Sequence, residues 1–229
     1  MEKIILLETS TSRCSAALAV GGEVVAYKED NTREHASLTA PFVKELLDGQ
    51  GWKVRDCDAV CVSMGPGSYT GLRVGVSTAK GLCFGAGIPL LALSSLDILC
   101  AQARQEGLLP QGCRWIVPMI DARRMEVYTA LYTPEGKQVT PIEAKIVDAG
   151  SFAGQLGDGP VLFIGDGAGK CREVLTGPNA FFIQDSPKAS AMALPAHRAW
   201  NEKRFEDIAY FEPFYLKEFV TTVSRKKLF

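Results

Sequence analysis

The sequence predicts an α/β fold made of two lobes, the second of which is shortened. Strand-like and helix-like runs alternate along roughly the first hundred residues, a pattern typical of a sheet covered by helices. Residues 106–112, rich in glycine, proline and glutamine, interrupt that alternation. Similar runs resume beyond them but occupy less chain. We therefore predict a first lobe over residues 1–105 and a smaller second lobe, with a C-terminal segment, over residues 106–229.

The first lobe is predicted to open with three strands and a helix. The turn pair Gly21-Gly22 separates the second strand from the third. Apolar side chains then recur at positions i, i+4 and i+8, which indicates a helix, and they form two rows rather than one. In chain order we predict strands over residues 4–8, 15–20 and 24–28, a helix over 38–47, a strand over 59–64, a small-residue helix over 72–84, a strand over 90–93 and a helix over 95–104.

The second lobe is predicted to repeat strands and helices on a smaller scale. Two full nucleotide-binding domains would need markedly more chain than 229 residues, so we expect the second lobe to be truncated. Its predicted elements are strands over residues 115–120, 126–132 and 139–147, a helix over 151–156, a strand over 161–164, a helix over 169–175, a strand over 181–183 and a last helical stretch over 189–203.

The order of elements in the first lobe, βββαβαβα, resembles the ribonuclease H-like half-domain of the actin-like ATPase (ASKHA) superfamily of actin, heat-shock chaperones and sugar kinases. In that superfamily an acidic residue and hydroxyl residues follow the first strand, and here these are Glu8, Ser10 and Thr11. A carboxylate at that place would hold Mg²⁺ through water, and the hydroxyls would donate to phosphate oxygens. The resemblance implies a weak nucleotide contact at these residues. The alternative is a β-turn with ordinary side chain-to-backbone bonds.

Composition indicates a globular protein without a membrane segment. Apolar residues make up 47% and charged residues 22% of the chain, as in ordinary globular domains. The longest apolar runs are far too short to cross a bilayer. The opening residues run straight into a strand-like segment and resemble no signal peptide, so we expect a cytoplasmic protein. Seven scattered cysteines without a C-x-x-C pair are expected to be free thiols in the core.

The charge balance argues against strong binding of nucleic acid by this chain alone. The formal net charge is −1, whereas a protein that grips nucleic acid by itself usually carries a basic surplus. The single basic run, Arg225-Lys226-Lys227, is either a solvated tail or a tail that touches RNA. If RNA is involved, we expect another protein to hold it.

A glycine loop over residues 65–71 is the most distinctive stretch of the chain. Its spacing, G-x-G-x-x-x-G, matches neither the dinucleotide fingerprint nor the phosphate-binding loop of P-loop ATPases. The alternative to an anion cradle is that the glycines permit a tight turn and a close backbone approach. Tyr69 and Arg73 would then be free for contacts with a partner.

No catalytic or metal-ligating set is evident in the sequence. The two histidines, His35 and His197, stand without the partners that a catalytic triad or a metal site requires. Asp121-Ala122-Arg123-Arg124 is predicted to be a hairpin turn with exposed ion pairs. Residues 165–169 form a strand-to-helix turn at which the superfamily places adenosine contacts, and a plain loop is the alternative.

Taken together, several stretches resemble the bacterial TsaB (YeaZ) family and run in that family's order along almost the whole chain. The most specific is the glycine loop with its continuation to Gly75. The others are Leu6 to Thr11, Glu34-His35 with the helix containing Leu38 and Pro41, Thr78 to Leu82, Leu93 to Asp97, Asp121 to Arg124 and Pro213 to Leu216.

The resemblance implies a subunit of the machinery that places threonylcarbamoyl on the tRNA adenosine next to the anticodon. A TsaD-type transferase would take threonylcarbamoyl from its AMP adduct, joined by a TsaE-type P-loop ATPase. The family's TsaD-type relatives carry an H-x-x-x-H metal motif at the position that here begins with Ser95 and ends with Leu99. The resemblance therefore implies an accessory subunit with no metal and no cofactor of its own, beyond weak ATP or ADP at the complex interface. The alternatives are a small-molecule kinase of the same superfamily and a peptidase.

The resemblance also implies where partners bind. Family members pair through two helices of the first lobe, with themselves when alone or with TsaD, and tRNA is reached only through the complex. Two apolar rows on one helix favour this, because a helix on a sheet needs only one. The alternative is that both rows pack on the sheet. The predicted interface comprises Leu38, Phe42, Leu46, Tyr69, Leu72 and Arg73.

Overall fold

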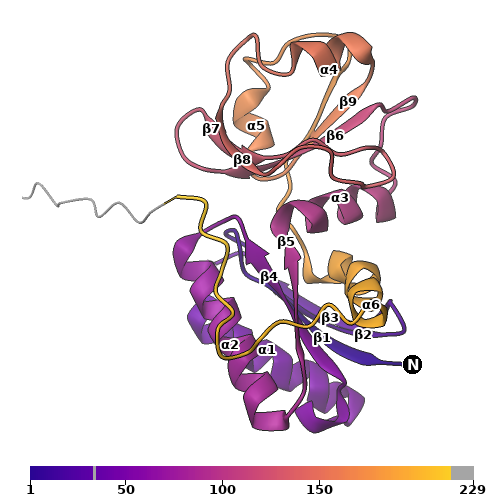
Figure 1. Cartoon of the computed structure of the whole chain (residues 1–229), viewed down its shortest axis with the longest axis vertical. Coiled ribbons are helices and arrows are strands. Elements are labelled where there is room, and N and C mark those ends of the chain that lie inside the picture. Colours follow the sequence, from indigo (N-terminus) through magenta and orange to yellow (C-terminus); the bar gives the residue numbers. More distant parts are fainter. Residues whose placement is uncertain (33–34, 218–229) are drawn as a thin grey trace, which may run out of the picture.

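The computed structural model describes residues 1–32 and 35–217. Two α/β lobes follow one another along the long axis, and α3 (Ser95–Gln105) lies between them (Figure 1). In the first lobe β1 pairs antiparallel with β2, and β2 with β3, while β4 and β5 join parallel on the other side. The sheet order is β3-β2-β1-β4-β5, formed by β1 (Lys3–Glu8), β2 (Cys14–Val20), β3 (Glu23–Asp30), β4 (Ala59–Gly65) and β5 (Leu90–Ser94).

Two long helices, α1 (His35–Gln50) and α2 (Tyr69–Ala86), cover one face of this sheet. The side chain of Ser68 caps the start of α2 by accepting a hydrogen bond from the Gly71 amide. Gly87, at φ 69°, ends α2 in the left-handed conformation that glycine adopts most readily. A single 3-10 turn, η1 (Val54–Asp56), follows α1.

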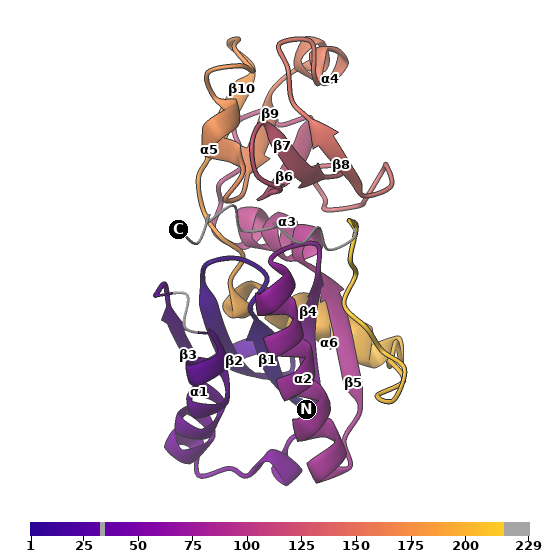
Figure 2. The ribbon, with the colours of Figure 1, turned by 90° about the vertical axis from the view of Figure 1, so that its left-hand side faces the viewer.

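The second lobe contains a sheet of order β8-β7-β6-β9-β10, which matches the order of the first sheet with β6 in the place of β1. One side of α3 packs on it, and two short helices, α4 (Ala153–Asp158) and α5 (Ala168–Cys171), lie beside it in Figures 1 and 2. The strands are β6 (Trp115–Asp121), β7 (Glu126–Thr129), β8 (Glu143–Ile146), β9 (Val161–Ile164) and β10 (Ala180–Ile183).

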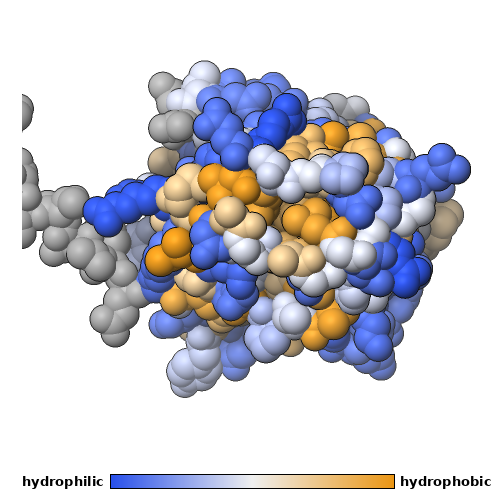
Figure 3. Space-filling model, turned by 90° about the horizontal axis from the view of Figure 1, so that it is seen from above, coloured by the Kyte–Doolittle hydropathy of each residue, from blue (hydrophilic) through white to orange (hydrophobic). Residues whose placement is uncertain are grey.

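The predicted arrangement of two α/β lobes is confirmed, and the shortening of the second lobe is located more closely. The second sheet has five strands, as the first does, so the second lobe is smaller because its helices are shorter. Seen from above, the second lobe shows apolar side chains between hydrophilic ones (Figure 3). Val139, Ile146 and Phe181 are exposed there, as a thin helical cover allows.

The chain returns to the first lobe after β10. The turn η2 (Ala189–Met192) and α6 (Ala193–Asn201) pack on the face of the first sheet opposite α1 and α2, together with Ile98 of α3. The sequence predicts that residues 106–229 form the second lobe and its C-terminal segment, but the apolar residues of α6 are buried against β1, β4 and β5 of the first lobe. They pack there because α3 alone leaves that face of the first sheet uncovered.

Residues 205–217, which we call the strap, continue from α6 along the first lobe (Figures 1 and 2). The amide of Glu206 donates to the carbonyl of Leu90 at 2.8 Å, and the amide of Phe214 donates to the carbonyl of Met64 at 2.8 Å. The predicted basic tail, Arg225-Lys226-Lys227, and Glu34 lie outside the described residues. Within residues 1–32 and 35–217, no helix combines the length and apolar character needed to cross a membrane.

Candidate functional site

A cleft of about 990 Å³ opens between the two lobes. The turn after β1 forms its floor on the first lobe, beside the starts of α1 and α2. The turn between β6 and β7 forms the wall on the second lobe, and the end of the strap forms the third side. The lining comprises residues 10–12, 35–37, 66–71 and 74, then 120–124, 126, 128 and 166, and finally 214–217.

Of the three residues proposed to contact a nucleotide, two lie in the turn after β1 and line the cleft, and the third does not. Ser10 and Thr11 line the cleft, and their hydroxyl groups are buried and make no hydrogen bond within the described chain. Glu8 lies beneath the floor with no exposed surface, and its Oε1 accepts the Ser10 amide at 2.6 Å. The two hydroxyls are therefore unpaired groups just beneath the cleft floor, whereas Glu8 does not line the cleft and does not fit a metal held there.

Burial also sets the charge of Glu8. It raises the pKa of the carboxyl to about 7, and the nearby side chain and backbone amide of Ser10 offset only part of that rise. The negative charge of Asp166, which lines the cleft from the second lobe, adds to it. The Asp166 carboxyl has a pKa raised to about 6, chiefly by burial, although its Oδ1 accepts the Asp121 amide at 2.9 Å. The cleft thus has one carboxyl below its floor and another in its wall.

The glycine loop brings α2 directly onto the turn after β1. The Ser68 amide donates to the Ser10 carbonyl at 2.6 Å, and Thr9 Oγ1 donates to the Gly71 carbonyl at 2.8 Å. A Cβ atom on Gly67 would lie 2.2 Å from the Ser10 carbonyl oxygen, and one on Gly71 would lie 2.1 Å from that of Thr9. The geometry confirms that these glycines permit a close backbone approach.

The Asp121–Arg124 turn does more than close a hairpin. Arg123 and Arg124 both have positive φ, 70° and 49°, which is uncommon for residues with a side chain. The Arg123 amide donates to Asp121 Oδ1 at 2.9 Å, and Lys170 pairs with the same carboxylate. Sequence analysis missed that this turn walls the cleft. The signal was its place at the end of the first strand of the second sheet, where the first sheet carries the Ser10 turn.

Tyr69 and Arg73, predicted to be free for a partner, are engaged within the chain. The rings of Tyr69 and Tyr215 lie 4.8 Å apart, and the Arg73 guanidinium lies 4.3 Å over the Tyr69 ring. Beyond this stack, Lys217 pairs with Glu126 at the start of β7. The prediction that these two side chains are free is therefore wrong, because they stack with the strap. Arg73 remains exposed, and a partner contact at Tyr69 and Arg73 stays a prediction.

The apolar part of the predicted interface is also corrected. The side chains of Phe42, Leu46 and Leu72 are buried, and Leu38 packs partly buried against the same core. Both apolar rows of α1 pack within the lobe, which was the alternative. The physical reason is that α1 contacts the sheet on one side and α2 on another, so a wide apolar stripe is used inside the chain.

A different set of side chains faces solvent on these helices. Phe84, near the end of α2, exposes 85% of its surface. Ser77 and Gly81 precede it on the same side of α2, and Ala36 and Ala40 are exposed on α1. This outer face of α1 and α2 combines small residues and one large aromatic ring with charged side chains of α1, namely Lys44, Glu45 and Asp48.

The two histidines are held by structural contacts. His35 Nε2 lies 2.8 Å from the carbonyl oxygen of Thr11, and His197 pairs with Glu2. Among residues 1–32 and 35–217, no three histidine, cysteine or acidic side chains cluster as metal ligands would. All seven cysteines are free. Ser95 and Leu99 are fully buried, and Leu99 belongs to the core between α3 and the second sheet.

Comparisons with known proteins agree with one another. The model of the TsaD family, tRNA N6-adenosine threonylcarbamoyltransferase, matches residues 23–211. The tRNA threonylcarbamoyladenosine biosynthesis protein TsaB of Bacillus subtilis is 32% identical over 93% of both chains. The Escherichia coli protein of the same name is 36% identical over 57% of this chain and 54% of its own, so the match spans about half the length of that relative. The crystal structure of YeaZ from Pseudomonas aeruginosa superposes with a TM-score of 0.82 at 29% identity, over 94% of this chain and 100% of that one.

Proposed function

The chain belongs to the TsaB (YeaZ) family, and from that premise we propose that it is an accessory subunit of tRNA threonylcarbamoyladenosine synthesis. Its relatives are named as biosynthesis proteins of this modification, and the one from Bacillus subtilis is matched over nearly its full length. In this proposal a TsaD-type transferase moves threonylcarbamoyl from threonylcarbamoyl-AMP to the tRNA adenosine beside the anticodon. The present chain supports that transferase, together with a TsaE-type ATPase, and works in the cytoplasm.

The start of α3 supports a role without catalysis. Ser95 and Leu99 stand where the resemblance to TsaD-type transferases would put two metal-binding histidines. Both side chains are fully buried, and Leu99 contributes to an apolar core. A helix whose ligand positions serve packing offers a metal ion neither nitrogen donors nor room.

The outer face of α1 and α2 is the surface we propose for the TsaD-type partner, and for a second copy when the chain is alone. Phe84 is the one large apolar side chain exposed along α2. Ser77 and Gly81 on the same side of α2 let another helix approach closely. The Phe84 ring beside them makes an anchor of the kind that dominates interfaces. The net charge of −1 is consistent with tRNA being held by the complex rather than by this chain.

The test is to replace Phe84 with glutamate in the full chain and assay both assembly and modification. Phe84→Glu should abolish co-elution with a TsaD-type protein and lower the threonylcarbamoyladenosine content of tRNA in cells that depend on this chain. Ile146→Glu is the matched control, because Ile146 is 73% exposed but lies on β8 of the other lobe. Circular dichroism should show both variants folded. A wild-type chain that neither co-elutes with the transferase nor supports modification would refute the proposal.

Nucleotide binding by the isolated chain is proposed to be weak, and to involve the hydroxyls of Ser10 and Thr11 without a resident metal. The two unpaired hydroxyls beneath the cleft floor would supply part of a phosphate cradle if a ligand exposed them, while Glu8 does not line the cleft. A dissociation constant of about 1 μM corresponds to about −8 kcal/mol, more than such a partial cradle supplies. Calorimetry with ATP and ADP should give a dissociation constant above about 1 μM for the wild-type chain. The same measurement is repeated on Ser10→Ala. Submicromolar binding that Ser10→Ala abolishes would contradict it.

A further inference from the structure

The interlobe cleft is flanked by two sets of polar contacts of different character. One set lies where the chain crosses from β10 back to η2, and the other lies where the strap reaches the second lobe. Figure 2 shows the crossover on the left of the molecule and the strap on the right.

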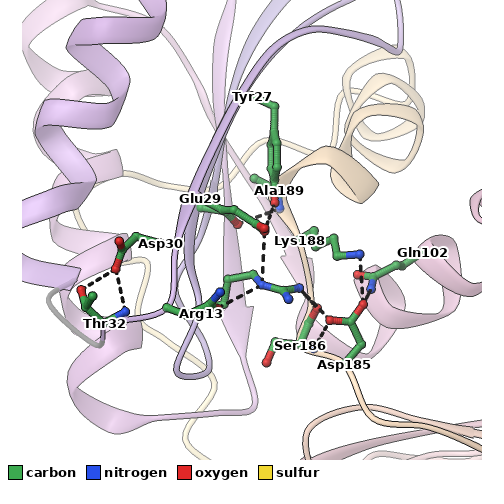
Figure 4. A network of polar contacts seen from close by, with 12 residues as sticks. Arg13, Tyr27, Glu29, Asp30, Thr32, Gln102, Asp185, Ser186, Lys188 and Ala189 are labelled. Atoms are coloured by element: carbon green, nitrogen blue, oxygen red, sulfur yellow. Dashed lines mark hydrogen bonds and ion pairs between the residues drawn. The ribbon is translucent and has the colours of Figure 1, made fainter.

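The crossover is held by a half-buried cluster that we call the hinge cluster: Arg13, Gln102, Asp185 and Lys188 (Figure 4). Arg13 Nη1 lies 2.9 Å from Asp185 Oδ1 and donates to the Ser186 carbonyl at 2.8 Å. Gln102 Nε2 donates to Asp185 Oδ2 at 2.7 Å, and Lys188 Nζ lies 3.0 Å from the same oxygen. The side chains of Arg13 and Asp185 are only 13% and 19% exposed.

The strap is anchored almost entirely to the first lobe. Lys80 Nζ on α2 donates to the carbonyls of Ala209 and Phe211 at 3.2 and 3.1 Å. The Tyr215 ring stacks on Tyr69 at the start of α2. At the end of the described chain, Lys217 reaches across the cleft to Glu126 on β7, and we call this ion pair the latch. Its side chains are 43% and 21% exposed.

The burial and the number of contacts decide whether the hinge cluster or the latch breaks first. An exposed pair between flexible side chains contributes little, because water and salt replace it readily. A buried charge that loses its partner is costly, because nothing solvates it. Asp185 would lose Arg13, Gln102 and Lys188 together if the crossover moved. Opening at the strap breaks the single Lys217–Glu126 pair, whose lysine is 43% exposed.

We propose that the two lobes pivot about the hinge cluster and that the Lys217–Glu126 latch is the side that opens, with the strap remaining on the first lobe. Arg13 belongs to the turn whose earlier residues line the cleft, so the pivot lies next to the cleft floor. Access to the cleft is then gated from the strap side. This inference concerns the mobility of the chain itself and stands whether or not the proposed function is correct.

Hydrogen exchange of the full chain, followed by mass spectrometry, tests the proposal. Lys217→Glu places two acids at the latch and should speed exchange about two- to fivefold in residues 120–126 and 214–217. Residues 184–188 should keep their wild-type rates. Lys145→Glu is the matched control, since Lys145 forms an exposed pair with Glu143 within the second sheet and spans no cleft. It should leave the exchange of all three segments unchanged.

The hinge cluster is tested separately. Asp185→Asn should speed exchange in residues 184–188 by on the order of tenfold. Arg13 and Lys188 would both lose the carboxylate that they share, although Arg13 keeps its ion pair with Glu29. If that variant does not fold, Arg13→Lys keeps the charge and tests the same contact. The proposal is overturned if Lys217→Glu exchanges like Lys145→Glu, if it exposes residues 184–188 before residues 214–217, or if neither hinge variant changes exchange at the crossover.

Discussion

The two lobes share a strand order and differ in their helices. In each sheet the first strand is central, an antiparallel hairpin lies on one side and two parallel strands lie on the other. The helices α1 and α2 of the first lobe have 16 and 18 residues, whereas α4 and α5 of the second have 6 and 4. A sheet with its turns is thus enough to build one wall of the cleft, while the long helices supply an outer surface.

Equivalent turns meet across the cleft. The turn after β1 supplies Ser10 and Thr11, and the turn after β6 supplies Arg123 and Arg124. The fourth strand of each sheet also ends alike. Gly65 ends β4 at φ 105°, and Gly165 follows β9 at φ 141°. The lobes therefore differ in their covering layer more than in the part that faces the cleft, and the following substitutions test that difference.

The largest effect is expected from a charge placed under the long helices. Phe42→Arg should lower the free energy of unfolding by about 4 kcal/mol, because it removes a buried ring and buries an unpaired charge. Lys28, whose Nζ lies 5.3 Å from the centre of the Phe42 ring, adds repulsion. Urea denaturation followed by circular dichroism measures the loss.

Phe181→Arg provides the comparison in the second lobe. Phe181 is on β10 and is 42% exposed, so an arginine can turn its head group into water at little cost. If both substitutions cost the same, the difference between a thickly and a thinly covered sheet is not what sets tolerance.

The next effect concerns the two carboxyls, one from each lobe. Glu8 has a pKa raised to about 7 by burial, so the folded chain binds more protons than the unfolded chain between about pH 4.5 and pH 7. Stability should consequently fall as pH rises through this window and level off above it. Glu8→Gln should remove that slope and add up to about 3 kcal/mol at pH 8. Thermal unfolding across the pH range measures both.

Asp166→Asn should give a smaller change of the same sign. Burial raises the pKa of Asp166 to about 6, but this carboxyl lines the cleft, where water screens it. If Asp166→Asn raised the free energy of unfolding more than Glu8→Gln, the Asp166 carboxylate of the second lobe would be the more costly of the two charges.

The smallest effects on stability are expected at two glycines of α2, where substitution by alanine should act in opposite directions. Gly71→Ala should cost about 2 kcal/mol, because its Cβ would meet the Thr9 carbonyl oxygen at 2.1 Å. Gly81→Ala should instead stabilise the monomer by about 0.5–1 kcal/mol, since nothing lies within 4 Å of its Cβ. Equal effects at both sites would mean that the contact between α2 and the Thr9 turn is looser than described.

Sequence periodicity predicted the strands of both lobes well, because alternation and turn residues are local. It also predicted the close approach of the glycine loop, for which the absence of a Cβ was a sufficient clue. It failed for α1. Two apolar rows suggest a surface and a core equally, and only the position of α2 shows that Phe42 and Leu46 are both inside.

Other parts of the site depended on contacts between distant segments. The Asp121–Arg124 turn faces the cleft only because the second sheet repeats the order of the first. Tyr69 is engaged because Tyr215, 146 positions later, stacks on it. Glu8 is beneath the floor because the Ser10 amide turns back to its carboxylate. No local pattern contains these facts.

The return of α6 to the first sheet has a consequence for how the chain is made. Synthesis on the ribosome delivers β1, β4 and β5 long before residues 189–200, which complete the core on their rear face. The whole second lobe emerges in between. Local folding of the N-terminal part can close the core under α1 and α2 at once, since all its main strands and helices are already present. Its other face keeps Ile4, Leu6 and Leu91 uncovered until translation is nearly finished, so the nascent chain passes through a stage at which a chaperone has an apolar sheet surface to hold.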